Sequence, residues 1–160
     1  MEITFRSAQP GDSPLILSFI RALADYEHML DEVSATVELL DEWLFEKHMA
    51  EVIFAVSCGE EVGFALFFTN FSTFVGTPGL YLEDLYVKPE HRGLGIGLAI
   101  MRKLARTAQE RGYGRFEWAC LDWNEPSIAF YRSLGAEPMG DWTTYRLSVE
   151  ALHKLAGEKK

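Results

Sequence analysis

The stretch DLYVKPEHRGLGIGLAIMRKLA, residues 84–105, decides how the fold of this chain is interpreted. Its strand-like apolar beginning ends at Pro89, and an arginine then precedes glycines at every second position, Gly93, Gly95 and Gly97. An amphipathic helix pattern follows these glycines. The strand is thus followed directly by a glycine-rich loop and then by the start of a helix. This arrangement brings unpaired backbone N–H groups and the positive end of a helix dipole to one point.

This glycine-rich loop is suited to binding an anion. Glycine lets the backbone approach a ligand without an intervening Cβ, and a helix N-terminus favours negative charge. Arg92 adds a permanent positive charge beside these donors. The alternative is a loop whose glycines only permit a tight turn. Three alternating glycines at the entrance of a helix favour a phosphate group over that alternative.

Two common phosphate-binding motifs fit this loop less well. The sequence GK[ST] of a P-loop is absent, and Lys103 lies too deep in the helix to replace its lysine. A dinucleotide fold is the weaker interpretation, because the spacing is G-x-G-x-G and Asp122 lies beyond the usual offset of ~20 residues. The chain also has too few remaining strand–helix units for a doubly wound sheet.

Composition and length narrow the class of protein. The chain has 160 residues, 48% of them apolar, and a net charge of −9. We expect one domain over residues 1–160. We expect no membrane association, because no segment approaches the ~20 apolar residues of a membrane span. We expect no nucleic-acid partner, because no basic cluster is present. The acidic excess indicates either a solvated surface or attraction for a cationic substrate. Cys58 and Cys120 form no motif, which favours reduced thiols and a cytoplasmic location. The histidines show no ligand spacing, so no metal is expected.

The hydrophobic pattern predicts an α/β domain with a mixed sheet. Turn residues and caps separate strands from helices along the whole chain. The expected strands are 2–7, 52–57, 61–71, 80–87, 115–121 and 142–149, and the expected helices are 13–29, 36–48, 95–111 and 125–134.

The pattern V-x-P-x-x-R-G-x-G-I-G at residues 87–97 resembles the acetyl-coenzyme A-binding motif of the GNAT superfamily of N-acetyltransferases. The segments LADYEHM (23–29), LYLEDLYV (80–87) and DWNEPSIAFYRSLGA (122–136) are similar to its spermidine/spermine (diamine) and thialysine N-acetyltransferase branch. The resemblance implies a mostly antiparallel central sheet flanked by helices, with a bulged strand that splays from its neighbour at the acetyl-coenzyme A slot. It also implies a homodimer that is paired in part through residues 142–147.

The same resemblance implies which residues contact the coenzyme. The strand before the loop would bind the pantetheine arm, the loop amides would bind the pyrophosphate, and the start of the later helix would line the coenzyme. These residues are Leu85, Tyr86, Val87, Arg92, Gly93, Leu94, Gly95, Ile96, Gly97, Leu98, Asn124, Glu125, Pro126 and Ser127.

Acetyl transfer to an amine has two chemical requirements. A primary amine with a pKa near 10.4 needs a base, and the departing thiolate benefits from a proton donor. Glu83 and Asp84 are adjacent in an otherwise apolar strand, where neighbouring side chains point to opposite faces. By resemblance, Glu83 is the water-mediated base and contacts the amine, Asp84 helps to define the pocket for the cation, and Tyr131 is the general acid.

Further substrate contacts are implied at Tyr26 and Glu27 and at Glu117, Trp118 and Ala119. One departure is that Thr143 stands where the family pattern has an acidic residue, which puts long polyamines in doubt. The leading hypothesis is direct transfer of acetyl to a polyamine, a diamine or a lysine-like amino acid. The alternatives are a protein N-terminal or lysine acetyltransferase and a non-catalytic module that senses acyl-coenzyme A.

Overall fold

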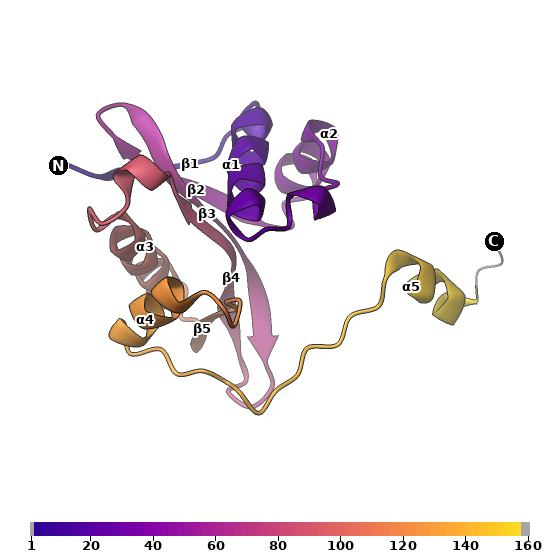
Figure 1. The fold of residues 1–160 in the computed structure, drawn as a ribbon. Coiled ribbons are helices and arrows are strands. Elements are labelled where there is room, and N and C mark those ends of the chain that lie inside the picture. Colours follow the sequence, from indigo (N-terminus) through magenta and orange to yellow (C-terminus); the bar gives the residue numbers. More distant parts are fainter. Residues whose placement is uncertain (1, 158–160) are drawn as a thin grey trace. The chain divides into compact units, whose positions relative to one another are not determined.

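The computed structural model describes residues 2–157, which form two compact units that divide after Ala119. The first unit holds a five-stranded sheet with helices on both faces, as Figure 1 shows. The strands are β1 (Thr4–Ser7), β2 (Glu51–Ser57), β3 (Glu60–Ser72), β4 (Thr77–Val87) and β5 (Arg115–Trp118). The α-helices are α1 (Ser13–Tyr26), α2 (Val37–Leu40) and α3 (Ile96–Glu110); a π-helix covers Asp41–Glu46, and short 3₁₀ turns cover Leu30–Glu32 and Pro89–His91.

The sheet has the order β1-β2-β3-β4-β5, with antiparallel pairing up to β4 and parallel pairing between β4 and β5. This confirms the mixed, mostly antiparallel sheet that the resemblance implied. The parallel pairing joins only residues 79–82 of β4 to β5, so the part of β4 from Glu83 to Val87 continues without a β5 partner. Pairing stops there because β5 itself ends at Trp118.

Strand β4 also carries the expected irregularity. Leu66 of β3 lies opposite Asp84, whereas the next residue, Phe67, lies opposite Leu82. Glu83 is thus an extra residue on β4, which is the definition of a β-bulge. The bulge falls at the point where pairing with β5 ends, so both distortions that open this edge of the strand coincide.

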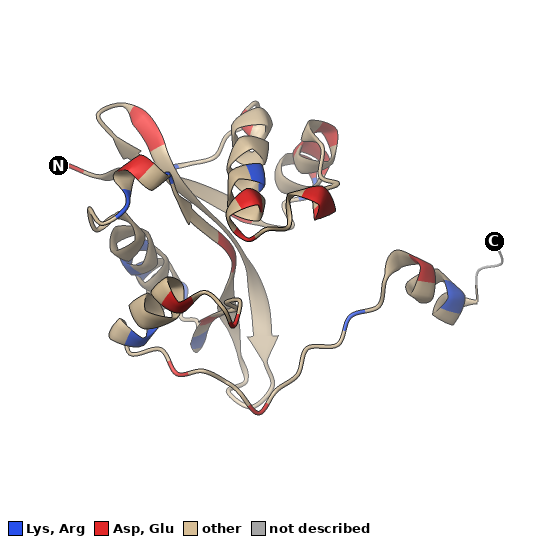
Figure 2. Cartoon of the chain, viewed as in Figure 1, with Lys and Arg blue, Asp and Glu red and all other residues tan. Residues whose placement is uncertain are grey.

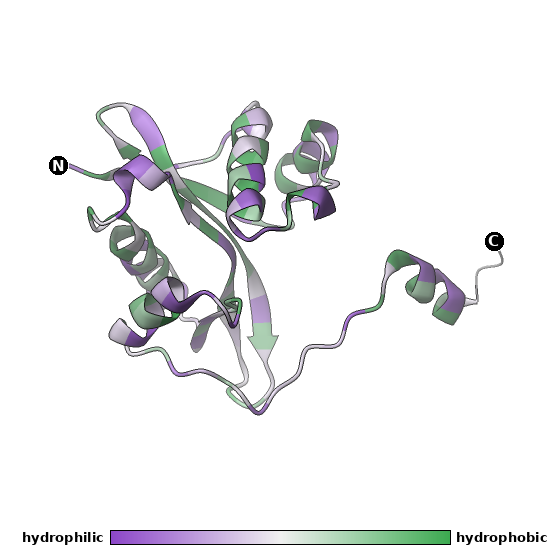
Figure 3. Ribbon diagram, viewed as in Figure 1, coloured by the Kyte–Doolittle hydropathy of each residue, from purple (hydrophilic) through white to green (hydrophobic). Residues whose placement is uncertain are grey.

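Two apolar layers enclose the sheet, and the hydrophobic stretches of the strands are visible in Figure 3. On one face, Phe19 of α1 stacks on Phe64 of β3 with 5.1 Å between ring centroids and contacts Phe54 and Tyr86. On the other face α3 buries its apolar side; a Cβ added to Gly63 of β3 would lie 3.3 Å from Ile100. Burial of a large apolar side chain contributes about 1.5–3 kcal/mol, so these layers dominate the stability of the sheet.

A three-residue ion network fixes the start of α1 to the sheet. Arg6 of β1 donates to both carboxylate oxygens of Asp12, at 2.7 and 3.1 Å, and to Glu61 of β3 at 2.8 Å. Asp12 also accepts the N–H of Gln9, and its bond with Arg6 lowers the pKa of its carboxyl. The Arg6 guanidinium lies 4.4 Å from the centroid of the Phe54 ring, which adds a cation–π contact.

The second unit contains two helices, α4 (Glu125–Ser133) and α5 (Val149–Ala156). Asn124 caps α4, because its side chain accepts the N–H of Ser127. Ser148 caps α5 in the same way through the N–H of Ala151. None of the helices in residues 2–157 combines the length and apolarity that crossing a membrane requires.

The expected last strand at 142–149 is wrong, because residues 142–148 have no regular structure and α5 begins at Val149. The alternation of Tyr145, Leu147 and Val149 is typical of a strand, but a strand also needs hydrogen bonds to a neighbouring strand. The sheet contains only β1 to β5 among the described residues, so this segment has no partner strand there. Its apolar side chains are exposed, Tyr145 by 92%.

Candidate active site

The bulge on β4 gives its two carboxylates different surroundings. Asp84 lies opposite Leu66, which packs against the core on the α1 face, so the Asp84 side chain points to that face and is partly buried. Glu83, the inserted residue, is exposed. Figure 2 shows acidic positions (red) on β4 and at the end of α1, and basic positions (blue) along α3.

Asp84 has the most strongly perturbed carboxyl of this group. Its burial, and then the neighbouring charges of Glu83 and Glu27, raise the pKa of Asp84 from 3.8 to about 6. Glu27, the C-cap residue directly after α1, also has a raised pKa because of its burial. Asp84 is therefore under the influence of two further negative charges, and a cation bound beside it would relieve this repulsion.

Tyr26, the last residue of α1, is connected to β4 through Arg92. The Arg92 guanidinium carbon lies 4.8 Å from the centroid of the Tyr26 ring and 5.2 Å from that of Tyr86. Arg92 Nε donates to the carbonyl oxygen of Val87 at 2.9 Å. The sequence predicted a charged neighbour of the glycine loop at this position, whereas the contact with α1 has no sequence signal.

The glycine loop has a left-handed backbone conformation at two of its glycines. Gly93 and Gly95 adopt left-handed φ values of 75° and 80°, which favour glycine. Gly95 caps α3, no acidic residue lies in the first turn, and a Cβ at Gly93 or Gly95 would meet no atom within 4 Å. Gly97 lies inside α3 and is not among the residues with a left-handed φ, so its backbone conformation does not require glycine. The first N–H groups of a helix have no intrahelical acceptor, and here they adjoin the unpaired end of β4.

The implied substrate segment at the end of β5 lies beside β4. Glu117 is opposite Tyr81 and Trp118 is opposite Leu82, and Ala119 follows β5. Glu117 accepts a hydrogen bond from Asn70 Nδ2 at 2.7 Å and pairs with Arg115 at 3.2 Å. These two partners compensate part of its negative charge.

Tyr81 is a residue of this surface that the sequence analysis did not single out. Burial, Glu83 and Glu117 raise the pKa of its hydroxyl, and its ring stacks on Phe68 at 5.1 Å. A tyrosine that alternates with apolar residues in a strand is usually a packing residue, so only its position between two carboxylates distinguishes it.

The remaining predicted residues belong to the second unit. Asn124 is buried, and Glu125, Pro126 and Ser127 form the first turn of α4. Tyr131 lies one turn later on α4, partly buried, with its ring 5.4 Å from that of Phe130.

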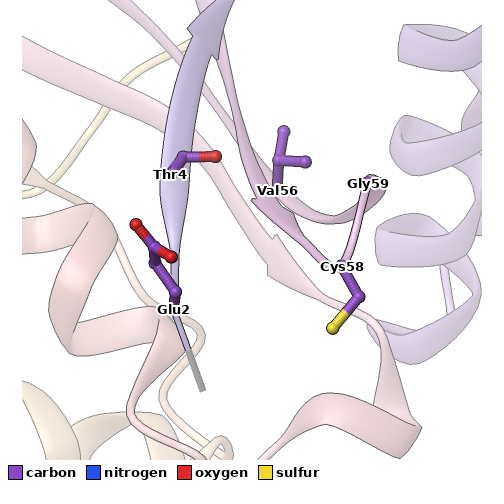
Figure 4. Close-up of a pocket in the computed structure, with 5 residues that line it drawn as sticks. All are labelled: Glu2, Thr4, Val56, Cys58 and Gly59. Atoms are coloured by element: carbon purple, nitrogen blue, oxygen red, sulfur yellow. The ribbon is translucent and has the colours of Figure 1, made fainter.

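Two other features of the described residues do not form a site of this kind. Residues 2–157 contain no cluster of three metal-ligating side chains. Figure 4 shows a hollow near the start of β1 that is lined by Glu2, Thr4, Val56, Cys58 and Gly59. None of the candidate catalytic, coenzyme-binding or substrate-binding residues lines this hollow. Cys58 and Cys120 are free thiols, as expected.

Comparison with known proteins agrees with this geometry. The profile of the acetyltransferase (GNAT) family matches residues 18–136. The thialysine N-epsilon-acetyltransferase of Sus scrofa is 38% identical over 170 residues, which cover 98% of each chain. The spermidine/spermine N(1)-acetyltransferase-like protein 1 of Homo sapiens is 34% identical over 96% of this chain and 24% of its own length. A solved structure of an integron cassette protein from V. cholerae has a TM-score of 0.80 at 28% identity, over 98% of each chain.

The chain therefore belongs to the GNAT family and is an N-acetyltransferase. More particularly, it is similar over nearly its full length to enzymes named for acetylation of the small amine thialysine.

Proposed function

We propose that this protein transfers an acetyl group from acetyl-coenzyme A to a primary amine of a small cationic molecule: a polyamine, a diamine or a lysine-like amino acid. The observation that carries the proposal is the partly buried Asp84 beside the bulge of β4, whose pKa is raised by its burial and by the charges of Glu83 and Glu27. These carboxylates suit an ammonium group, and the same strand leads directly to the anion-binding loop. The full-length similarity to thialysine N-epsilon-acetyltransferases supports this substrate class.

The coenzyme would lie along the unpaired part of β4. Leu85, Tyr86 and Val87 would contact its pantetheine arm through their backbone. The amides from Gly93 to Leu98 would donate to the pyrophosphate, and Arg92 contributes its charge at the base of this loop. Glu125, Pro126 and Ser127, behind the cap Asn124, would line the coenzyme from α4.

Glu83 would act as the base. Because Glu83 is exposed at the bulge, it can accept the amine proton through a water molecule, whereas the partly buried Asp84 and Glu27 hold the cation. At pH 7, deprotonation of an amine with a pKa near 10.4 costs about 4–5 kcal/mol, so a positioned base is needed. The neutral nitrogen would attack the thioester carbonyl carbon, the C–S bond would break, and Tyr131 would protonate the departing sulfur. The second proton, which the nitrogen loses as the amide forms, would return through water to the Tyr131 phenolate.

Substrate length would depend on the surface beyond the carboxylates. Tyr26 lies on the α1 side, and Glu117, Trp118 and Ala119 lie at the end of β5. Since Asn70 and Arg115 compensate the charge of Glu117, and Thr143 is neutral, we favour short amines over long polyamines.

The experiment is a panel of amines assayed for release of free coenzyme A. We expect turnover with 1,3-diaminopropane, lysine or thialysine, slower turnover with spermine, and none with peptides that carry a free N-terminus. Turnover confined to the peptides would contradict the proposal and favour a protein acetyltransferase.

We also propose that the protein is a homodimer that resides in the cytoplasm. The apolar side chains of the segment 142–155 support pairing with a second copy, because Trp142, Tyr145 and Leu155 are exposed by 77%, 92% and 77%. Light scattering on the wild type and on Tyr145→Asp tests this. A monomeric wild type, or an unchanged mass in the variant, would contradict it. The free thiols Cys58 and Cys120 are consistent with a reducing compartment.

A further inference from the structure

Arg92 connects the glycine loop to the end of α1. Its Nε donates to the Val87 carbonyl oxygen at 2.9 Å, and its guanidinium carbon lies 4.8 and 5.2 Å from the ring centroids of Tyr26 and Tyr86. Within this group, Tyr86 and Val87 belong to the sheet. Tyr86 is only 8% exposed and packs edge-on against Phe19, so these two partners form the fixed side of the contact.

Tyr26 is the other side of the contact, and it ends a helix. Glu27 follows it directly as the C-cap, and His28 then adopts a left-handed φ of 60° as the chain leaves α1. Backbone hydrogen bonds close this helix end, since the N–H groups of His28 and Met29 donate to the carbonyl oxygens of Asp25 and Ala24 at 3.1 and 2.8 Å. The Arg92 guanidinium adds a side-chain contact that joins this turn to the loop before α3.

The position of Glu27 matters because it follows Tyr26 directly, and Tyr26 packs on the same apolar cluster as Leu66, the residue opposite Asp84. The charge of Glu27 is also one of the causes that raise the pKa of Asp84. A shift of the α1 end would therefore separate two of the three carboxylates that hold the amine.

We propose that Arg92 is a positioning residue for the amine, and that it couples the coenzyme loop to the amine site by clamping Tyr26 against β4. The inference rests on the proposed function for the identity of the two ligands. Binding of a pyrophosphate to the amides from Gly93 onward fixes the loop that carries Arg92. The fixed guanidinium then holds Tyr26, and with it Glu27, in the place where the amine is bound. By linkage, the amine strengthens coenzyme binding by the same factor.

The test is calorimetry with coenzyme A and 1,3-diaminopropane, each titrated alone and in the presence of the other. These ligands form a complex without reaction, so the readout does not require catalysis. For the wild type we expect coenzyme A to tighten amine binding by about five- to tenfold. In Arg92→Gln, amine binding in the presence of coenzyme A should weaken by about tenfold, because two cation–π contacts and one hydrogen bond are lost. Binding of coenzyme A alone should weaken less than amine binding does, because Arg92 contributes its charge to the loop while the backbone amides supply the donors to the pyrophosphate.

Three further variants make the test specific. Arg92→Lys keeps the charge but loses the planar guanidinium and the Nε–H, so it should behave like Arg92→Gln. Tyr26→Leu removes the same contact from the α1 side and should weaken amine binding similarly. The double variant Arg92→Gln/Tyr26→Leu should bind the amine no more weakly than either single variant. The matched control is Arg102→Gln, an exposed arginine on α3, which should leave both affinities unchanged.

Several results would overturn the inference. One is loss of coenzyme A binding in Arg92→Gln with unchanged amine affinity, which would assign the guanidinium to the pyrophosphate. Unchanged affinities for both ligands, or full rescue by Arg92→Lys, would equally exclude the clamp. Turnover separates the two proposals: a wild type that binds the amine but forms no acetylated product contradicts the proposed function and leaves the clamp standing.

Discussion

Replacement of Asp84 by asparagine should make the ligand-free protein more stable at neutral pH. Burial and the charges of Glu83 and Glu27 raise the pKa of Asp84 from 3.8 to about 6. The native state therefore binds more protons than the unfolded state between these two pH values, and stability falls as the pH rises through that range. At about 1.4 kcal/mol per pH unit, the ionised carboxylate costs the fold up to about 3 kcal/mol above pH 7.

Asparagine has nearly the same shape and cannot ionise, so Asp84→Asn removes this cost. We expect the gain in the free energy of unfolding to be near zero below pH 4, to grow between pH 4 and 6, and to reach its full value by pH 7. Urea denaturation of the wild type and the variant at a series of pH values measures it. Asp31→Asn, at an exposed aspartate, is the matched control and should show no pH-dependent gain.

The same variant should bind the amine poorly, because one of the carboxylates that hold the cation has lost its charge. Stability and binding would then change in opposite directions, which is the behaviour expected of a functional group held in an unfavourable environment. A variant that is no more stable than the wild type at pH 7–8, or equally more stable at every pH, would refute the reasoning.

The other predictions concern the loop, the ion network and the core. Gly95→Ala should lower the free energy of unfolding by about 1–2 kcal/mol, because Gly95 has a φ of 80°, and it should also weaken coenzyme A binding. Urea denaturation measures the first effect and calorimetry the second. Wild-type values in both would exclude a conformational role for Gly95. Asp12→Asn should destabilise the protein by about 1–3 kcal/mol at pH 7. Because the hydrogen bond from Arg6 lowers the pKa of Asp12, this loss of stability should fade as the pH falls below 3.8. A loss of stability that does not depend on pH would contradict this prediction. Phe64→Ala should cost about 3–5 kcal/mol, since Phe64 is 0% exposed and stacks on Phe19; a cost below 1 kcal/mol in a thermal or urea melt would mean that the two faces are not packed as described.

Most elements of the first unit could be predicted from periodicity and turn residues. Prolines and glycines mark most boundaries, as at Gly112 after α3, and the observed strands differ from the expected ones by a few residues. The expected second helix is an α-helix only over 37–40 and continues as a π-helix, a distinction that side-chain periodicity does not carry. The last strand was wrong because alternation describes what a strand would bury, not whether a partner strand exists.

The candidate site shows the same division between local and long-range information. The glycine loop could be predicted, because its conformation depends on its own residues, Gly93 and Gly95. The adjacency of Glu83 and Asp84 was visible as well. Their environments were not, since the bulge and the approach of Glu27 depend on the register of β3 and on where α1 ends. The contact of Arg92 with Tyr26 joins residues 66 positions apart and leaves no local pattern.

The measurement that tests the central claim most directly is acetyl transfer from acetyl-coenzyme A to 1,3-diaminopropane by the wild type, Glu83→Gln and Tyr131→Phe. Product is followed by mass spectrometry and rate by release of free coenzyme A. The account predicts turnover by the wild type, with kcat lowered by about 10²-fold or more in each variant and with coenzyme A binding retained, because a general acid or base contributes about 10²–10⁴-fold. A wild type that binds coenzyme A but acetylates no small amine, or variants with wild-type kcat, would contradict it.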